Sequence, residues 1–106
     1  MRKILLACAG GMSTSIIVGK MNKYASSQGI EVEIKALAAN EALERLKEGW
    51  EIILLGPQVK FYKEQLDAEI KKENLTIPVY VIPFQDYGSA DGEAILKMAF
   101  KLLGDK

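Results

Sequence analysis

Residues 4–15 read ILLACAGGMSTS, and they indicate the fold of the chain more clearly than any other part. Its apolar start, Ile4–Ala7, is short and uninterrupted, which is typical of a strand buried on both faces of a parallel sheet. One cysteine and two glycines follow, and Ser13, Thr14 and Ser15 then open an amphipathic segment. Glycines allow a tight turn and hydroxyl residues favour a helix start, so the stretch predicts strand, loop and helix in that order.

The rest of the chain repeats this alternation of short apolar runs and longer amphipathic segments. The pattern predicts four strands, at Ile4–Ala7, Val32–Ile34, Ile52–Leu55 and Val79–Ile82. It predicts four helices: Ser13–Ser27, a short one from Asn40 as N-cap to near Gly49, one that follows Gly56-Pro57 and runs to about Lys72, and one ending at Leu103. Strands separated by such helices form a parallel α/β sheet with helices on both faces. We expect the strand order 2-1-3-4, with the alternating strand 2 at an edge.

This order also predicts where a ligand would bind. In open parallel sheets, ligands lie beyond the carboxyl ends of the strands, at the point where the strand order reverses. Here that point falls between the first and third strands. Three loops should meet there: Cys8–Ser15, Gly56–Gln58 and Phe84–Tyr87.

Length and charge limit the possible functions. The chain has 106 residues, the size of one domain, and we expect residues 1–106 to form a single one. Fourteen basic residues balance fourteen acidic ones, which gives no attraction to nucleic acid or to an anionic membrane. No apolar run reaches the ~20 residues of a membrane helix, and Ile4–Ala7 is shorter than the ~7–15 residues of a secretory core. We therefore expect a cytoplasmic protein.

Cys8 is the only cysteine, and the chain has no histidine. An internal disulfide, a Cys-His pair, an imidazole metal site and a phosphohistidine on this chain are therefore excluded. A lone cysteine suits a reducing compartment. We expect no metal and no cofactor, because backbone amides can take the place of a cation.

The position of Cys8, after a strand and before a helix start, suits an anion site. The first N–H groups of a helix have no internal partner, and the helix dipole is positive there. Such amides stabilise a thiolate and would equally hold a phosphoryl group bonded to its sulfur. A lone cysteine is most often a small buried apolar residue without a chemical role. Here the glycines and hydroxyl residues that follow Cys8 favour a reactive cysteine instead. We predict that Cys8 carries a phosphoryl group in a loop of Ala9, Gly10, Gly11, Met12, Ser13, Thr14 and Ser15.

Several other kinds of site do not fit. The chain has no Gly-Lys-Ser/Thr for a nucleotide P-loop and no Cys-x-x-Cys for thiol redox chemistry. Receiver domains need acidic residues after strands 1 and 3, where this chain has Cys8-Ala9 and Gly56-Pro57.

On these residues the chain resembles the enzyme IIB components of the bacterial phosphoenolpyruvate-dependent sugar phosphotransferase system, of the lactose, cellobiose and N,N'-diacetylchitobiose type. The similarity covers the whole chain and is most specific over residues 4–15. It implies that Cys8 accepts a phosphoryl group from a phosphohistidine on a IIA partner. It further implies that Cys8 passes this group to a sugar in the membrane component IIC, from a monomer that meets the membrane only transiently through IIC. It does not imply which sugar.

The low-molecular-weight tyrosine phosphatases have a similar fold and loop, and they keep a stand-alone phosphatase open as a second hypothesis. Their loop is Cys-(x)5-Arg-Ser/Thr, and Thr14 stands here in place of the arginine. Without a guanidinium to stabilise the transition state, hydrolysis should be slow. Asp86 is the nearby candidate for a general acid, although a turn residue or helix cap is its ordinary role. A module that only senses phosphate is the third hypothesis.

Four other residues are weaker candidates. Gln58 and Tyr87 should lie near the crevice, and whether they or Asp86 take part stays open. Met12 should sit at the loop tip, where it could contact a partner or simply pack. Trp50, before the third strand, is most simply structural.

Overall fold

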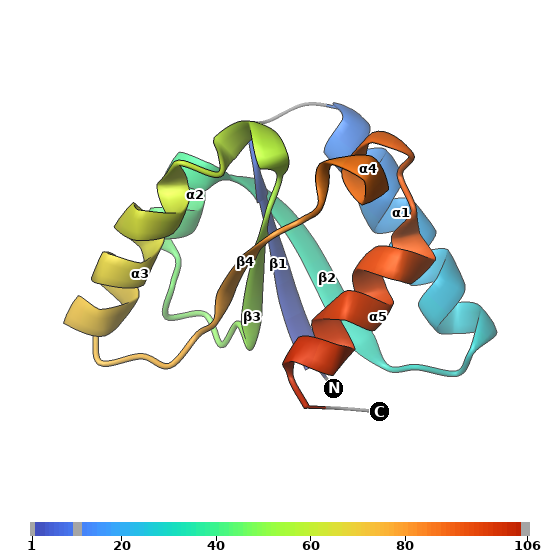
Figure 1. The fold of residues 1–106 in the computed structure, drawn as a ribbon. Coiled ribbons are helices and arrows are strands. Elements are labelled where there is room, and N and C mark those ends of the chain that lie inside the picture. Colours follow the sequence, from blue (N-terminus) through green and yellow to red (C-terminus); the bar gives the residue numbers. More distant parts are fainter. Residues whose placement is uncertain (1, 10–11, 105–106) are drawn as a thin grey trace.

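Four parallel strands form one sheet in the order β2-β1-β3-β4, as the sequence predicts (Figure 1). The computed structural model describes residues 2–9 and 12–104. The strands are β1 (Arg2–Cys8), β2 (Val32–Ala38), β3 (Ile52–Leu55) and β4 (Val79–Val81). The helices are α1 (Met12–Ser27), α2 (Ala39–Glu44), α3 (Tyr62–Lys72), α4 (Phe84–Gly88) and α5 (Gly92–Leu102), with a 3-10 turn at Pro57–Val59. Within this part of the chain, no helix is both long and apolar enough to cross a membrane.

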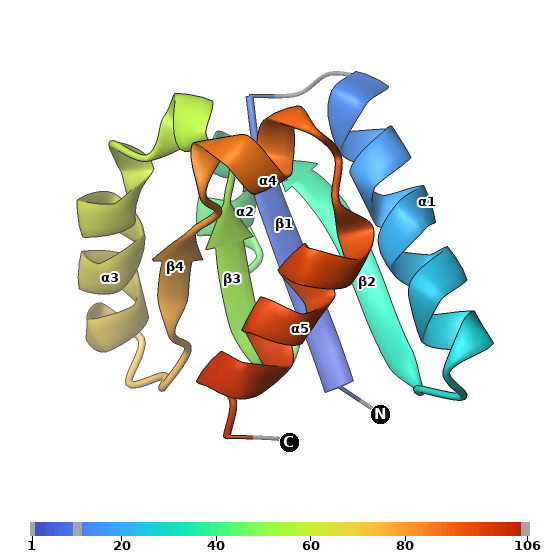
Figure 2. The ribbon, with the colours of Figure 1, turned by 45° about the vertical axis from the view of Figure 1, so that its right-hand side comes forward.

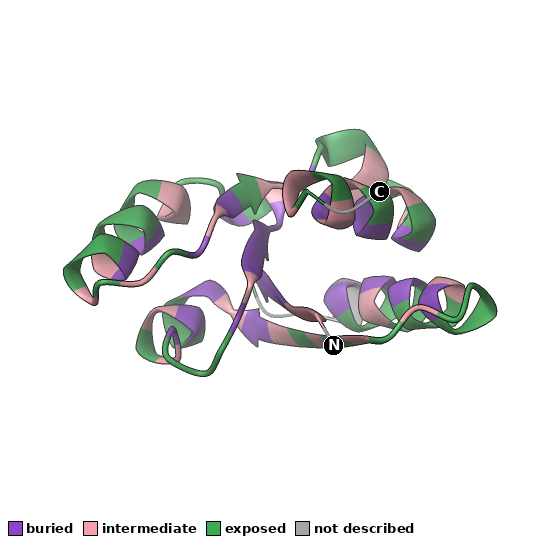
Figure 3. Cartoon of the chain, turned by 90° about the horizontal axis from the view of Figure 1, so that it is seen from below, coloured by how far each residue is buried: buried purple, intermediate pink, exposed green. Residues whose placement is uncertain are grey.

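Helices cover both faces of the sheet, and β1 contributes to both cores. Ile4 and Leu6 pack with α1 and α5, whereas Leu5 and Ala7 pack with α2 and α3. This division follows from the two-residue period of a strand, which sends alternate side chains to opposite faces. Figure 2 shows α1 and α5 on one side and α3 on the other, and Figure 3 shows that the buried positions of the helices and strands lie between them.

Two sequence predictions about helix boundaries are wrong. Asn40 is not an N-cap, because β2 runs directly into α2, whose N-cap is Ala38 without a side-chain hydrogen bond. Phe84–Tyr87 is not a loop but the greater part of the short helix α4. Pro83 explains this helix, since its fixed backbone angle suits the residue before a helical turn. The cap that the sequence analysis missed is Asp91, whose carboxylate accepts from the N–H of Ala94 at 3.0 Å at the start of α5.

Gly92 fixes the distance between α1 and α5. A Cβ atom at this position would lie 2.6 Å from the carbonyl carbon of Lys20 and 2.6 Å from the nitrogen of Met21. Both atoms belong to the backbone of α1, so no side-chain movement could make room. The glycine therefore lets α5 lie directly against the helix whose first turn follows Cys8.

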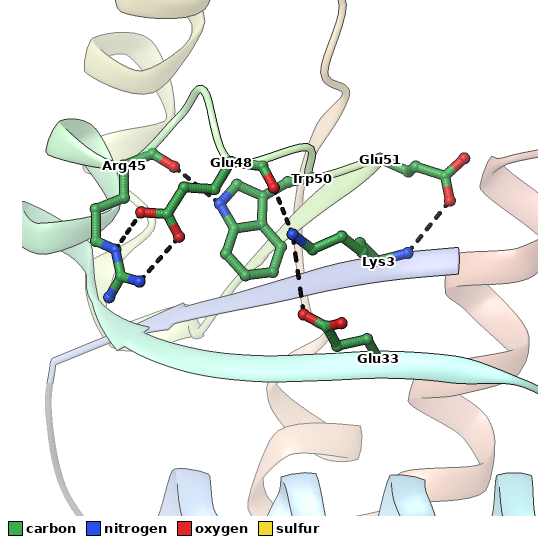
Figure 4. A network of polar contacts seen from close by, with 6 residues as sticks. All are labelled: Lys3, Glu33, Arg45, Glu48, Trp50 and Glu51. Atoms are coloured by element: carbon green, nitrogen blue, oxygen red, sulfur yellow. Dashed lines mark hydrogen bonds and ion pairs between the residues drawn. The ribbon is translucent and has the colours of Figure 1, made fainter. Parts of the chain in front are cut away.

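Charged side chains connect the elements at the amino end of the sheet (Figure 4). Arg2 pairs with Glu51 at 2.8 Å, and the guanidinium of Arg45 donates to both carboxylate oxygens of Glu48. Trp50 is 4% exposed; its indole N–H donates to the carbonyl of Arg45, and the ammonium of Lys3 lies 4.6 Å from its ring centre. The prediction that Trp50 is structural agrees with these contacts.

Candidate functional site

Cys8 is the last residue of β1, at the carboxyl end of the central strand. Its side chain is 5% exposed, and its thiol donates to the backbone carbonyl of Leu37 at 3.4 Å. Parallel pairing explains the contact, because Cys8 lies opposite Ala38 in the register of β1 and β2. The neighbouring strand β2 therefore helps to hold the sulfur at the carboxyl end of the sheet.

A small open pocket of about 220 Å³ leads to Cys8. Ala9 and residues from the α2 and α3 side line it, with Asn40, Phe61 and Tyr62 at its edge. Phe61 is 69% exposed although it is a large aromatic side chain. The sulfur is thus nearly covered by its own chain, but it has an opening rimmed by an exposed aromatic ring.

Helix α1 begins at Met12, so Met12 is the first helical residue rather than part of a loop tip. Thr14 lies in its first turn and is 3% exposed, whereas Ser15 faces solvent. Gly10 and Gly11, and the side chains of Met12 and Ser13, lie outside the described residues. The prediction that these four belong to a phosphate loop therefore stays a prediction.

Thr14 touches a residue that is distant in sequence, because its hydroxyl oxygen lies 3.3 Å from that of Tyr87. In Figures 1 and 2, α4 lies beside the first turn of α1, above the sheet. Tyr87 also packs against the end of β3, where a Cβ atom on Gly56 would lie 3.2 Å from its ring. Gly56 in turn donates its N–H to the carbonyl of Ala7 at 2.9 Å.

The structure thus brings together the ends of the segments that the sequence analysis expected to meet. Gln58 and Asp86, whose part in the site the sequence leaves open, differ in their exposure. Gln58 is exposed beside Gly56, whereas Asp86 is half-buried in the first turn of α4. The sequence analysis missed a fourth segment, the junction of β2 and α2, which supplies Leu37 and Asn40. The strand order contains the signal for it, since β2 pairs with β1 and its end must flank Cys8.

Two groups at this place can support chemistry. A cysteine thiol can act as a nucleophile, and the first N–H groups of a helix such as α1 have no partner within the helix. In residues 2–9 and 12–104 no group of three or more His, Cys, Asp or Glu side chains could hold a metal ion.

The parallel order 2-1-3-4 with a cysteine after its first strand defines a class of proteins, the α/β domains that share the architecture of the low-molecular-weight tyrosine phosphatases. Within this class the family is specific. The model of the lactose/cellobiose-specific IIB subunits of the phosphotransferase system matches residues 3–98, and the chain belongs to this family.

Two EIIB components with similar sequences support this family assignment. The chain is 44% identical, over 103 residues and 97% of each chain, to the oligo-beta-mannoside-specific EIIB component of Bacillus subtilis. It is 39% identical, over 105 residues and 94% of each chain, to the cellobiose-specific EIIB component of Lactococcus lactis.

Solved structures of this family have the same fold. A cellobiose-specific IIB protein from Borrelia burgdorferi superposes with a TM-score of 0.77 at 36% identity, over 97% of this chain and 92% of that one. The lactose-specific IIB domain of Streptococcus pneumoniae gives 0.78 at 18% identity, over 94% and 95%, which shows the shared fold alone. The chain is therefore a sugar-specific IIB component of a phosphotransferase system, and components of this kind act as phosphotransferases in sugar transport.

Proposed function

We propose that Cys8 is the residue that carries the phosphoryl group, between a phosphohistidine of a IIA component and a sugar bound by a IIC component. The observation that carries the proposal is the position of the sulfur: it lies at the end of β1, one short loop before α1, with a pocket open to it. The chain has no other cysteine and no histidine to take this role. The phosphate loop would comprise Ala9 to Ser15.

Two displacements at phosphorus describe the reaction. In the first, the thiol gives up its proton and the sulfur electron pair forms an S–P bond while the N–P bond of the donor breaks. The electron pair of that bond returns to the imidazole nitrogen. In the second, a sugar hydroxyl loses its proton and forms an O–P bond, while the S–P bond breaks and the sulfur regains a proton. Backbone N–H groups at the start of α1 stabilise the charge on the phosphoryl oxygens in both steps.

Neutral donors suit a carrier, which must release the group that it binds. A guanidinium at the position of Thr14 would grip the phosphoryl oxygens in bidentate fashion and favour hydrolysis, as in the phosphatases. A threonine hydroxyl gives one hydrogen bond and no charge. The phosphocysteine should therefore survive long enough to reach its acceptor.

The partners would dock at the carboxyl end of the sheet. The exposed ring of Phe61 beside the opening to Cys8 suits contact with a protein surface, because aromatic residues are enriched in such interfaces. The sugar would be of the cellobiose, chitobiose or lactose class, which fits the oligo-beta-mannoside and the cellobiose named for the two relatives. The protein would act as a cytoplasmic monomer.

Intact-mass measurement tests the proposal. A IIA component of the lactose/cellobiose type is charged from phosphoenolpyruvate through its upstream carriers and then mixed with the full chain. We expect the mass to rise by one phosphoryl group in the wild type and not in Cys8→Ser, with both proteins folded by circular dichroism. Equal uptake by Cys8→Ser would disprove the role of the sulfur, and release of phosphate from an aryl phosphate by the protein alone would favour a phosphatase.

A further inference from the structure

We propose that Tyr87 is a positioning residue for phosphoryl transfer, which orients the Thr14 hydroxyl so that Thr14 donates a hydrogen bond to the phosphoryl group on Cys8. This inference rests on the proposed function and adds a residue from α4, at the far end of the chain from the loop. It concerns the direction of one hydrogen bond and the contacts that hold it.

The first step is the contact itself. The two hydroxyl oxygens lie 3.3 Å apart, and either could be the donor. Thr14 is the one buried polar residue among those whose burial is described, and a buried hydroxyl needs a partner. Tyr87 supplies this partner from the other side of the site.

The second step is the direction of the bond. A hydroxyl has one proton and can accept from others. If Tyr87 donates to Thr14, the Thr14 proton remains available to another acceptor. A phosphoryl group at neutral pH offers its oxygens mainly as acceptors, so it needs a donor beside it. The two requirements are met together when Tyr87 donates to the Thr14 hydroxyl and the Thr14 hydroxyl donates to the phosphoryl group.

The third step is what holds the ring. One face of Tyr87 lies against Gly56, where a Cβ atom would come within 3.2 Å of the ring. The backbone fixes the residue at both sides, because Tyr87 donates its N–H to Pro83 at 3.0 Å and accepts from Ala90 at 3.1 Å. These contacts restrict the ring, so it can serve as a reference for the Thr14 hydroxyl. This is the behaviour expected of a residue that positions another.

A double-mutant cycle tests the inference. Tyr87→Phe removes one hydroxyl and keeps the ring, and Thr14→Val removes the proposed target and keeps the shape. The rate of phosphoryl uptake from the phosphorylated IIA component is measured for the wild type, both single variants and the double variant. Tyr80→Phe, which removes a hydroxyl from an exposed tyrosine on β4, is the matched control.

We expect Tyr87→Phe to slow uptake by about three- to tenfold in the wild-type background, the effect of one hydrogen bond on a rate. In the Thr14→Val background the same change should alter the rate by less than about twofold, because coupled residues are not additive. In Thr14→Ser, which restores a hydroxyl, the dependence on Tyr87 should return. Tyr80→Phe should match the wild type.

Equal slowing by Tyr87→Phe with and without the Thr14 hydroxyl would overturn the inference, since it would mean that Tyr87 acts through the fold alone. No slowing in any background would overturn it as well. These results leave the proposed function standing, provided that the wild type takes up its phosphoryl group on Cys8. If the wild type takes up none, the proposed function fails first and the inference fails with it.

Discussion

The two ends of the sheet are held together by different kinds of contact. At the amino end, Arg2 pairs with Glu51 at 2.8 Å and the ammonium of Lys3 lies over the indole of Trp50, and both contacts join residues that are distant in sequence. At the carboxyl end, the described contacts of Thr14 and Tyr87 join uncharged hydroxyls at 3.3 Å, and the thiol of Cys8 donates to a carbonyl. Under the proposed function, the contacts of the first end serve stability, whereas the second end would accept and release a charged group. The comparison predicts that stability and transfer can be changed separately.

Trp50→Ala should give the largest change in stability. The indole is buried, donates one hydrogen bond and carries the ammonium of Lys3. Its removal should lower the free energy of unfolding by about 3–5 kcal/mol. The rate of phosphoryl uptake per folded molecule should not change. Urea unfolding measures the stability, and intact-mass measurement of samples quenched at successive times measures the rate. A large fall in the rate would mean that stability and transfer cannot be changed separately.

Thr14→Val should show the opposite pattern. Loss of the hydroxyl should slow phosphoryl uptake by on the order of a hundredfold, the effect of deleting one donor to a developing charge. The cost in stability should be only about 1 kcal/mol, since one neutral hydrogen bond is lost. The same two measurements apply. A variant that unfolds easily but transfers at the normal rate would contradict this prediction.

Two helical glycines, one packed and one open, test how closely α1 and α5 approach each other. Gly92→Ala forces a Cβ atom into the backbone of α1 and should cost about 1–3 kcal/mol. Gly19→Ala is the matched control, because no atom lies within 4 Å of the new Cβ, and it should raise stability by about 0.5–1 kcal/mol. Thermal unfolding separates the two. Equal effects would mean that the close approach of α1 and α5 is not maintained in solution.

The smallest effect concerns pH at the amino end. The hydrogen bond from Arg45, aided by its charge, holds the pKa of Glu48 below its usual range. A lowered pKa in the folded state adds stability above the unfolded pKa of about 4.3, and this is lost as pH falls through the folded value. Glu48→Gln should therefore be slightly less stable than the wild type at neutral pH. The two unfolding curves should converge in acid; a difference that persists there would assign the effect to packing.

Helices and strands can be predicted from the sequence where the hydrophobic periodicity and the turn residues indicate the same boundaries. Ile52–Leu55 is a buried strand, as the pattern predicts. The errors occur where two elements join without a loop, at Ala38–Ala39, and where a proline starts a helix too short to show a period, at Phe84. Local propensity does not determine such junctions, because tertiary packing does.

The site, too, can be predicted from the sequence only in part. The reactive residue is visible in the sequence, since Cys8 stands alone between a strand and a glycine pair. The partner of Thr14 is not visible there, because the two residues are 73 positions apart and only the folded sheet brings α4 beside the first turn of α1. Contacts of this length depend on the strand order and on side-chain packing together.

Both edges of the sheet are poor templates for another strand. β4 is three residues long and lies between Pro78 and Pro83, which cannot donate to a ladder. β2 is longer, but it exposes Glu33 and Lys35 along its edge. Short, charged or proline-bounded edges resist edge-to-edge aggregation. Copies of the protein are therefore not expected to join through the edges of their sheets, even at high concentration.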